Sequence, residues 1–189
     1  YLGSIYERSG KIEKAIQNWN DSISVYPLQY EFYYKLGVNQ IKVSNLIDAK
    51  KNLLKSIELN QNYTDAYSSL STIYQSLNDF VKAEDCLRKA LTINPKCAII
   101  NYNLGSLLLM LGKNKEAEHY TQESISINDK IPQSFLNLGC IYYASGQLER
   151  AALNTRKAID LNPNNYLAFS NLGNILRQMN KLDEAESLV

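Results

Sequence analysis

The residues of this chain that could do chemistry are few and stand far apart. His119 is the only histidine, and the three cysteines, Cys86, Cys97 and Cys140, follow one another at long and unequal spacings. A nucleophile needs an adjacent base, and a zinc site needs histidines or cysteines paired at short spacing. Neither pattern is present, and there is no glycine-rich phosphate loop. The sequence therefore predicts no catalytic residue, no metal site and no cofactor site, and we expect a protein that is not an enzyme.

A more regular set of polar side chains is formed by asparagines. Asn103, Asn137 and Asn171 stand 34 residues apart, and each comes directly before a Leu-Gly pair. An amide offers both donors and an acceptor, so a row of three could hold the backbone of an extended peptide. The alternative is that the match reflects composition, because asparagine is common throughout the chain.

The step of 34 residues runs through the whole chain and indicates a repeat. It is marked by an alanine in each copy and, twelve residues earlier, by a glycine or serine. These positions hold Ala15, Ala49, Ala83, Ala117, Ala151 and Ala185, and Gly3, Gly37, Ser71, Gly105, Gly139 and Gly173. A fixed period of this length is typical of a solenoid. We expect the small residues to lie where two helices cross, because a larger side chain there would overpack the crossing by about 1–3 kcal/mol.

Each repeat is predicted to be a helical hairpin. Phe135, Leu138 and Tyr142 recur on one helical face, and a second periodic run follows around Ala151 and Ala158. A residue that tolerates the left-handed conformation stands between the two runs, at Gly10, Ser44, Asn78, Gly112, Gly146 and Asn180. First helices are expected at 30–43, 64–77, 98–111, 132–145 and 166–179. Second helices are expected at 12–25, 46–59, 80–93, 114–127 and 148–161.

The best copies read Phe135-Leu-Asn-Leu-Gly-Cys-Ile-Tyr142 and Tyr67-Ser-Ser-Leu-Ser-Thr-Ile-Tyr74. With the alanines that follow, this pattern resembles the tetratricopeptide repeat, and the resemblance covers the whole chain. It implies an all-α fold, a right-handed α–α superhelix of stacked hairpins. As a single solenoid over 1–189, the repeats would span 1–29 (partial), 30–63, 64–97, 98–131, 132–165 and 166–189 (partial).

The resemblance also implies where a partner binds, because in this family the first helices line the concave side. At these positions the middle repeats hold mostly apolar residues, namely Ile99, Tyr102, Leu109, Met110, Leu136 and Tyr143. An exposed apolar patch marks an interaction site, whereas the alternative is that these side chains pack against neighbouring helices. Asn103, Asn137 and Asn171 share this side and look like the asparagine ladder in the repeat arm of O-linked N-acetylglucosamine transferases.

Composition limits the partners further. The net charge is +1, and no apolar run approaches the length of about 18 residues that a membrane span needs. We therefore expect neither a nucleic-acid nor a membrane partner. An odd, sparse set of cysteines indicates reduced thiols and a cytoplasmic location. The repeat pattern is cut at both ends, so we expect a fragment of a longer protein whose uncapped ends self-associate.

Two functions remain open at this point. The first is a non-catalytic protein–protein interaction scaffold that binds an extended peptide or partner segment in its concave groove. The alternative is the substrate-recognition arm of a larger, glycosyltransferase-like transferase whose catalytic domain lies outside this chain.

Overall fold

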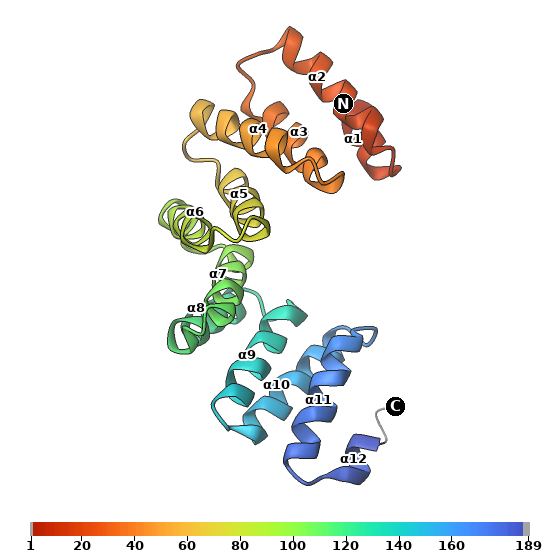
Figure 1. Ribbon diagram of the computed structural model, residues 1–189, viewed down its shortest axis with the longest axis vertical. Helices are drawn as coiled ribbons and strands as arrows, with labels where there is room; N and C mark the ends of the chain where they lie inside the picture. The colour runs from red at the N-terminus through yellow and green to blue at the C-terminus, as the bar shows by residue number, and fades with distance from the viewer. Residues whose placement is uncertain (1, 187–189) are drawn as a thin grey trace. The chain divides into compact units, whose positions relative to one another are not determined.

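The computed structural model describes residues 2–186, in which it shows twelve α-helices and no strand. The helices form two compact units, which we call unit 1 (Tyr1–Pro95) and unit 2 (Lys96–Val189) (Figure 1). In each unit the helices pair into successive hairpins. The predicted all-α fold of stacked helical hairpins is confirmed.

The helices lie where the repeat predicts them. Unit 1 contains α1 (Leu2–Arg8), α2 (Ile12–Val25), α3 (Tyr30–Lys42), α4 (Leu46–Leu59), α5 (Thr64–Ser76) and α6 (Phe80–Ile93). Unit 2 contains α7 (Ala98–Met110), α8 (Asn114–Ile127), α9 (Pro132–Ala144), α10 (Leu148–Leu161), α11 (Tyr166–Gln178) and α12 (Leu182–Glu186). The second helices α2, α4, α6, α8 and α10 match their predicted bounds. The first helices α3, α5, α7, α9 and α11 end one residue early, because the residue after each already turns the chain toward the next helix.

The hairpin turns explain where the first helices stop. All six predicted positions have a positive φ: Gly10, Ser44, Asn78, Gly112, Gly146 and Asn180. In the turn at Gly146, where φ is 74°, the N–H of Gln147 donates to the carbonyl of Tyr142 at 2.8 Å. This bond satisfies a carbonyl that the end of the helix leaves unpaired.

Small residues lie at close helix crossings, as predicted, at Gly3, Gly37, Gly105 and Gly139. A Cβ added to Gly139 would clash with Oγ1 of Thr155 and would lie 3.4 Å from the carbonyl oxygen of Ala151. Ala151 and Thr155 are fully buried. At the corresponding crossing in unit 1 a leucine stands in place of this threonine. A Cβ on Gly37 would lie 3.0 Å from Cγ of Leu53.

Stacking brings the first helices of unit 2 side by side. α7 contacts α9, and α9 contacts α11, while α8 and α10 each pack against the first helix that follows them (Figure 1). Positions that share a place in the repeat therefore recur on one surface made by α7, α9 and α11. We call this surface the first-helix face of unit 2. No helix within residues 2–186 is both long and apolar enough to cross a membrane.

Candidate partner-binding site

The first-helix face of unit 2 is almost free of charge. α7 and α9 contain no charged residue, and α11 contains Arg177 alone. The complete second helices of this unit, α8 and α10, are by contrast rich in charge: Lys115, Glu116, Glu118, Glu123, Glu149, Arg150, Arg156, Lys157 and Asp160. Loss of charged residues is typical of the centre of a protein interface. The charge pattern thus sets one side of unit 2 apart as a candidate contact surface.

Most of the apolar side chains predicted for this surface are accessible on it. Ile99 is 53% exposed, Met110 56% and Tyr143 40%, while Tyr102 and Leu109 are half-buried. Leu136 differs, because only 7% of it is exposed and it packs against Ala158 and Ala168. Leu136 therefore packs α9 against α10 and α11, and it is not part of the exposed surface.

The three asparagines lie at the same place on α7, α9 and α11, but their surroundings differ. Asn103 is half-buried on α7. Asn171 donates from Nδ2 to the Sγ atom of Cys140 at 3.4 Å. The Nδ2 atom of Asn137 is buried, and it has no acceptor among the described residues. Leaving a buried donor unpaired costs about 1–3 kcal/mol, so Asn137 is the least satisfied member of the row.

Asn101, another asparagine of α7, has an amide with a structural role. Asn101 stands two residues before Asn103 on α7, at the repeat position where the other copies have an aromatic ring. It is 3% exposed and donates from Nδ2 to the carbonyl of Cys97 at 3.0 Å. Asn101 thus supports the start of α7.

A pocket of about 100 Å³ opens between α9 and α11. It is lined by Gly139, Cys140, Tyr143, Asn171, Asn174 and Ile175. Burial raises the pKa of the Cys140 thiol, so the sulfur stays protonated and apolar in character at neutral pH. The sequence did not predict this pocket, although Cys140 and Asn174 share one repeat position, which could have placed them across from each other.

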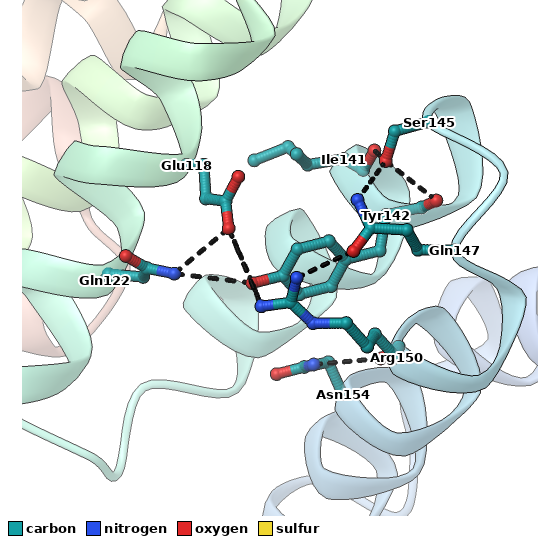
Figure 2. Close-up of polar contacts among 8 residues, drawn as sticks. All are labelled: Glu118, Gln122, Ile141, Tyr142, Ser145, Gln147, Arg150 and Asn154. Atoms are coloured by element: carbon teal, nitrogen blue, oxygen red, sulfur yellow. Dashed lines mark hydrogen bonds and ion pairs between the residues drawn. The ribbon is translucent and has the colours of Figure 1, made fainter.

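A polar network joins the two complete hairpins of unit 2 (Figure 2). The Tyr142 hydroxyl on α9 donates to Oε1 of Glu118 on α8 at 2.8 Å and accepts from Nη2 of Arg150 on α10 at 2.6 Å. The Arg150 guanidinium also lies 3.9 Å from the centre of the Tyr142 ring. Gln122 donates to both Glu118 and Tyr142. These groups pair with one another, so the network holds α8, α9 and α10 together.

Models of the repeat family match most of unit 2 and part of unit 1. A model described as a tetratricopeptide repeat matches residues 64–97 and 98–131, and a second, described as a TPR repeat, matches residues 139–180. The chain belongs to the tetratricopeptide repeat family. The family resemblance drawn from the sequence is thereby confirmed.

Solved tetratricopeptide repeat structures share the fold. PilF from Pseudomonas aeruginosa is 17% identical with a TM-score of 0.89, over 99% of this chain and 85% of that chain. MamA is 23% identical with a TM-score of 0.74, over 85% and 94% of the two chains. YrrB, described as a tetratricopeptide repeat protein with an unusual peptide-binding site, is 21% identical with a TM-score of 0.71, over 90% and 88%. No curated protein matches the chain by sequence.

The residues with reactive side chains do not converge in this repeat protein. His119 is exposed on α8, where its ring meets that of Tyr120 with centroids 5.0 Å apart. Burial, and then the nearby carboxylates Asp85 and Asp79, raise the pKa of Cys86 to about 11, so its thiol is protonated at neutral pH. Within residues 2–186 no three histidine, cysteine or acidic side chains gather as a metal site would need.

Proposed function

We propose that the first-helix face of unit 2 binds an extended segment of a partner protein, and that the protein acts as a non-catalytic interaction scaffold. The observation that carries the proposal is the buried Nδ2 donor of Asn137, which has no acceptor among the described residues and lies between Asn103 and Asn171 on a face whose single charged residue is Arg177. A buried polar group without a partner needs an explanation. A carbonyl oxygen of a bound peptide would supply the missing acceptor.

Binding would combine backbone and side-chain contacts. The Nδ2 atom is buried while Asn137 as a residue is half-buried, so its side chain would have to change rotamer for the amide to reach a bound peptide. Packed helices lie about 8–10 Å apart, and an extended chain advances about 3.3 Å per residue. Amides on adjacent first helices would therefore reach backbone groups about three residues apart. Exposed Ile99, Met110 and Tyr143 would cover apolar side chains of the segment.

The fold supports this class of function. Tetratricopeptide repeat proteins bind proteins and peptides, and YrrB, one of the structural neighbours, is described as having a peptide-binding site. The small number of charged residues on this face also favours a polypeptide partner. The phosphates of a nucleic acid or the headgroups of a membrane would find no cluster of cations there.

The test measures the affinity of peptides that have been selected for binding to the protein from a displayed random library. We expect the double variant Asn137→Ala with Leu109→Asp to weaken binding by tenfold or more, because it removes the central donor and places a charge on the face. The matched control is Leu153→Asp, which changes a 70% exposed leucine on α10 and should leave affinity unaltered. Unchanged affinity in the double variant would refute the proposal.

The row of asparagines also keeps the alternative function open. If it acts as an asparagine ladder of the glycosyltransferase type, this chain is a substrate-recognition arm and binds polypeptide through the same face. The two proposals differ in what the full-length protein does to the bound segment. Transfer of a sugar from a nucleotide sugar to the peptide by the full-length protein would support the recognition arm, and binding without transfer would support the scaffold.

A further inference from the structure

The pocket between α9 and α11 gives the proposed binding face a place for one side chain of the partner. Its walls come from two consecutive first helices, with Cys140 on α9 and Asn174 on α11 at the same repeat position. Asn171, the neighbour of Asn137 in the row of asparagines, also lines it. A backbone held by the row would thus carry a side chain past this opening.

The size of the pocket restricts what can enter. An apolar cavity of about 150 Å³ holds one benzene molecule. The pocket measures about 100 Å³, so it suits a side chain smaller than a phenyl ring. An aromatic ring of the partner would not fit completely within it.

The lining of the pocket restricts the chemistry of the occupant. None of its six residues is charged, and the one charged residue of the three first helices, Arg177, does not line it. The lining of the pocket includes the buried residues Gly139 and Ile175 and the protonated thiol of Cys140. A charged side chain would lose its hydration here without meeting an opposite charge, which is unfavourable.

We propose that this pocket is a specificity subsite that receives one small aliphatic side chain, of alanine, valine or leucine, from the extended segment bound by the first-helix face. The inference rests on the proposed function and adds to it a sequence preference. Asn137 and Asn171 hold the backbone without selecting side chains, and the pocket selects by size and by absence of charge.

The first measurement is the selection itself, performed on the intact chain with a random library of peptides of roughly twelve residues. We expect one position of the recovered peptides to hold alanine, valine or leucine and to exclude aromatic and charged residues. Recovered peptides without such a position would overturn the subsite. Recovery of no binding peptide would count against the subsite and the proposed function together.

The second measurement fills the pocket from each wall in turn. We expect Cys140→Leu and Asn174→Leu each to weaken binding of a selected peptide by tenfold or more. A peptide with glycine at the selected position should recover most of the lost affinity, because the new side chain takes the place of the peptide's own. The matched control is Thr72→Leu, at the same repeat position on an exposed site of α5, and it should leave affinity unaltered.

The outcomes separate the subsite from the binding face. If both leucine variants bind the peptide as the original chain does while Asn137→Ala with Leu109→Asp does not, the subsite is wrong and the face stands. If neither set of variants changes affinity, the face itself is wrong. Should Cys140→Leu fail to fold by circular dichroism, Cys140→Val takes its place, because valine already occupies this repeat position at Val38. It should bind valine-containing and leucine-containing peptides more weakly than alanine-containing ones.

Discussion

Glycines at one repeat position let two helices cross closely, and the residue opposite each glycine sets how tight the crossing is. Thr121 faces Gly105 and Thr155 faces Gly139 in unit 2, whereas leucine faces Gly37 in unit 1. Threonine branches at Cβ and has a stiff side chain, so it cannot easily move aside. Tolerance of a larger residue at the glycine therefore depends on the local partner.

The substitution Gly139→Ala tests this contact. We expect it to lower the free energy of unfolding by about 1–3 kcal/mol, because the new methyl group clashes with Thr155 Oγ1 beside the Ala151 carbonyl. The matched variant is Gly37→Ala, whose Cβ would lie 3.0 Å from Cγ of Leu53. Its loss of stability should be smaller, because leucine is less stiff than threonine and can move aside more easily. Urea unfolding of the two variants measures the change in the free energy of unfolding for each. An equal loss in the two would contradict this explanation.

If Asn137 serves binding, its substitution should not destabilise the fold. We expect Asn137→Ala to leave the free energy of unfolding unchanged or to raise it, because the variant removes a buried donor that has no acceptor. Asn101→Ala should lower it by about 1 kcal/mol, since Asn101 bonds to the Cys97 carbonyl. Thermal melts of the two variants provide the comparison. A loss of stability in Asn137→Ala as large as in Asn101→Ala would show that Asn137 is structural.

At the scale of helices, tyrosines at one repeat position connect three elements in both units. Tyr142 lies between Glu118 and Arg150 in unit 2 (Figure 2). Tyr74 occupies the corresponding place in unit 1, where Lys50 and Lys82 lie 5.1 and 5.6 Å from the centre of its ring. Both tyrosines have a cation over the face of the ring, but Tyr142 also joins its neighbours through its hydroxyl.

This difference gives a paired test. We expect Tyr142→Phe to lower the free energy of unfolding by about 1–3 kcal/mol, because Glu118 and Arg150 lose the hydroxyl that each of them contacts. Tyr74→Phe keeps the ring that attracts the two lysines, so its effect should be within about 0.5 kcal/mol. Chemical unfolding of the two variants measures both values. An equal effect in the two would show that the hydroxyl of Tyr142 has no special role.

The helices could be predicted from the sequence because their signals repeat. The spacing of Gly139 and Ala151, and turn residues such as Gly146, recur in each copy and set the bounds of the hairpins. The network of Tyr142 and the pocket beside Cys140 could not be predicted in this way. They depend on side chains from different hairpins, such as Glu118 and Asn174, whose types change from copy to copy. The burial of Leu136 likewise follows from its contacts with Ala158 and Ala168, and its repeat position alone does not reveal it.

At the scale of the whole molecule, the first helices of the two units differ in the charged residues that they contain. In unit 1, Lys35 on α3 lies 3.9 Å from Glu7 on α1, and Asn39 donates to the same carboxylate. In unit 2 the corresponding helices have Arg177 as their single charged residue. The first helices of unit 1 thus include a charged residue that pairs with α1, whereas the face that we propose for binding in unit 2 has Arg177 as its single charged residue.

Tyrosines that are buried or half-buried make stability depend on pH in both units. Burial is the main cause that raises the pKa of six of them: Tyr34, Tyr63, Tyr67, Tyr74, Tyr102 and Tyr142. In the unfolded chain these phenols lose their protons near pH 10. The unfolded state therefore binds fewer protons than the folded state above that pH, and the free energy of unfolding falls as pH rises.

We expect the midpoint of urea unfolding to be steady from pH 7 to about pH 8 and to begin to fall as the thiols of Cys86 and Cys140 ionise in the unfolded chain. It should fall further above about pH 10, where the phenols of the unfolded chain ionise. Tyr63→Phe should reduce this fall, because burial and the neighbouring Tyr34 and Asp65 raise the pKa of Tyr63. Tyr166→Phe is the control, since Tyr166 is 84% exposed. A midpoint that stays constant up to pH 11 would contradict the account of the buried phenols.

The central claim is that the first-helix face of unit 2 receives an extended peptide through its asparagines. The most direct measurement is a nuclear magnetic resonance titration that follows asparagine side-chain amide signals while a selected peptide is added. We expect the signals of Asn137 and Asn171 to shift and saturate together, while those of Asn101 and of Asn154 on α10 stay in place. Shifts confined to residues of α8 and α10, with the Asn137 signal unmoved at saturation, would contradict it.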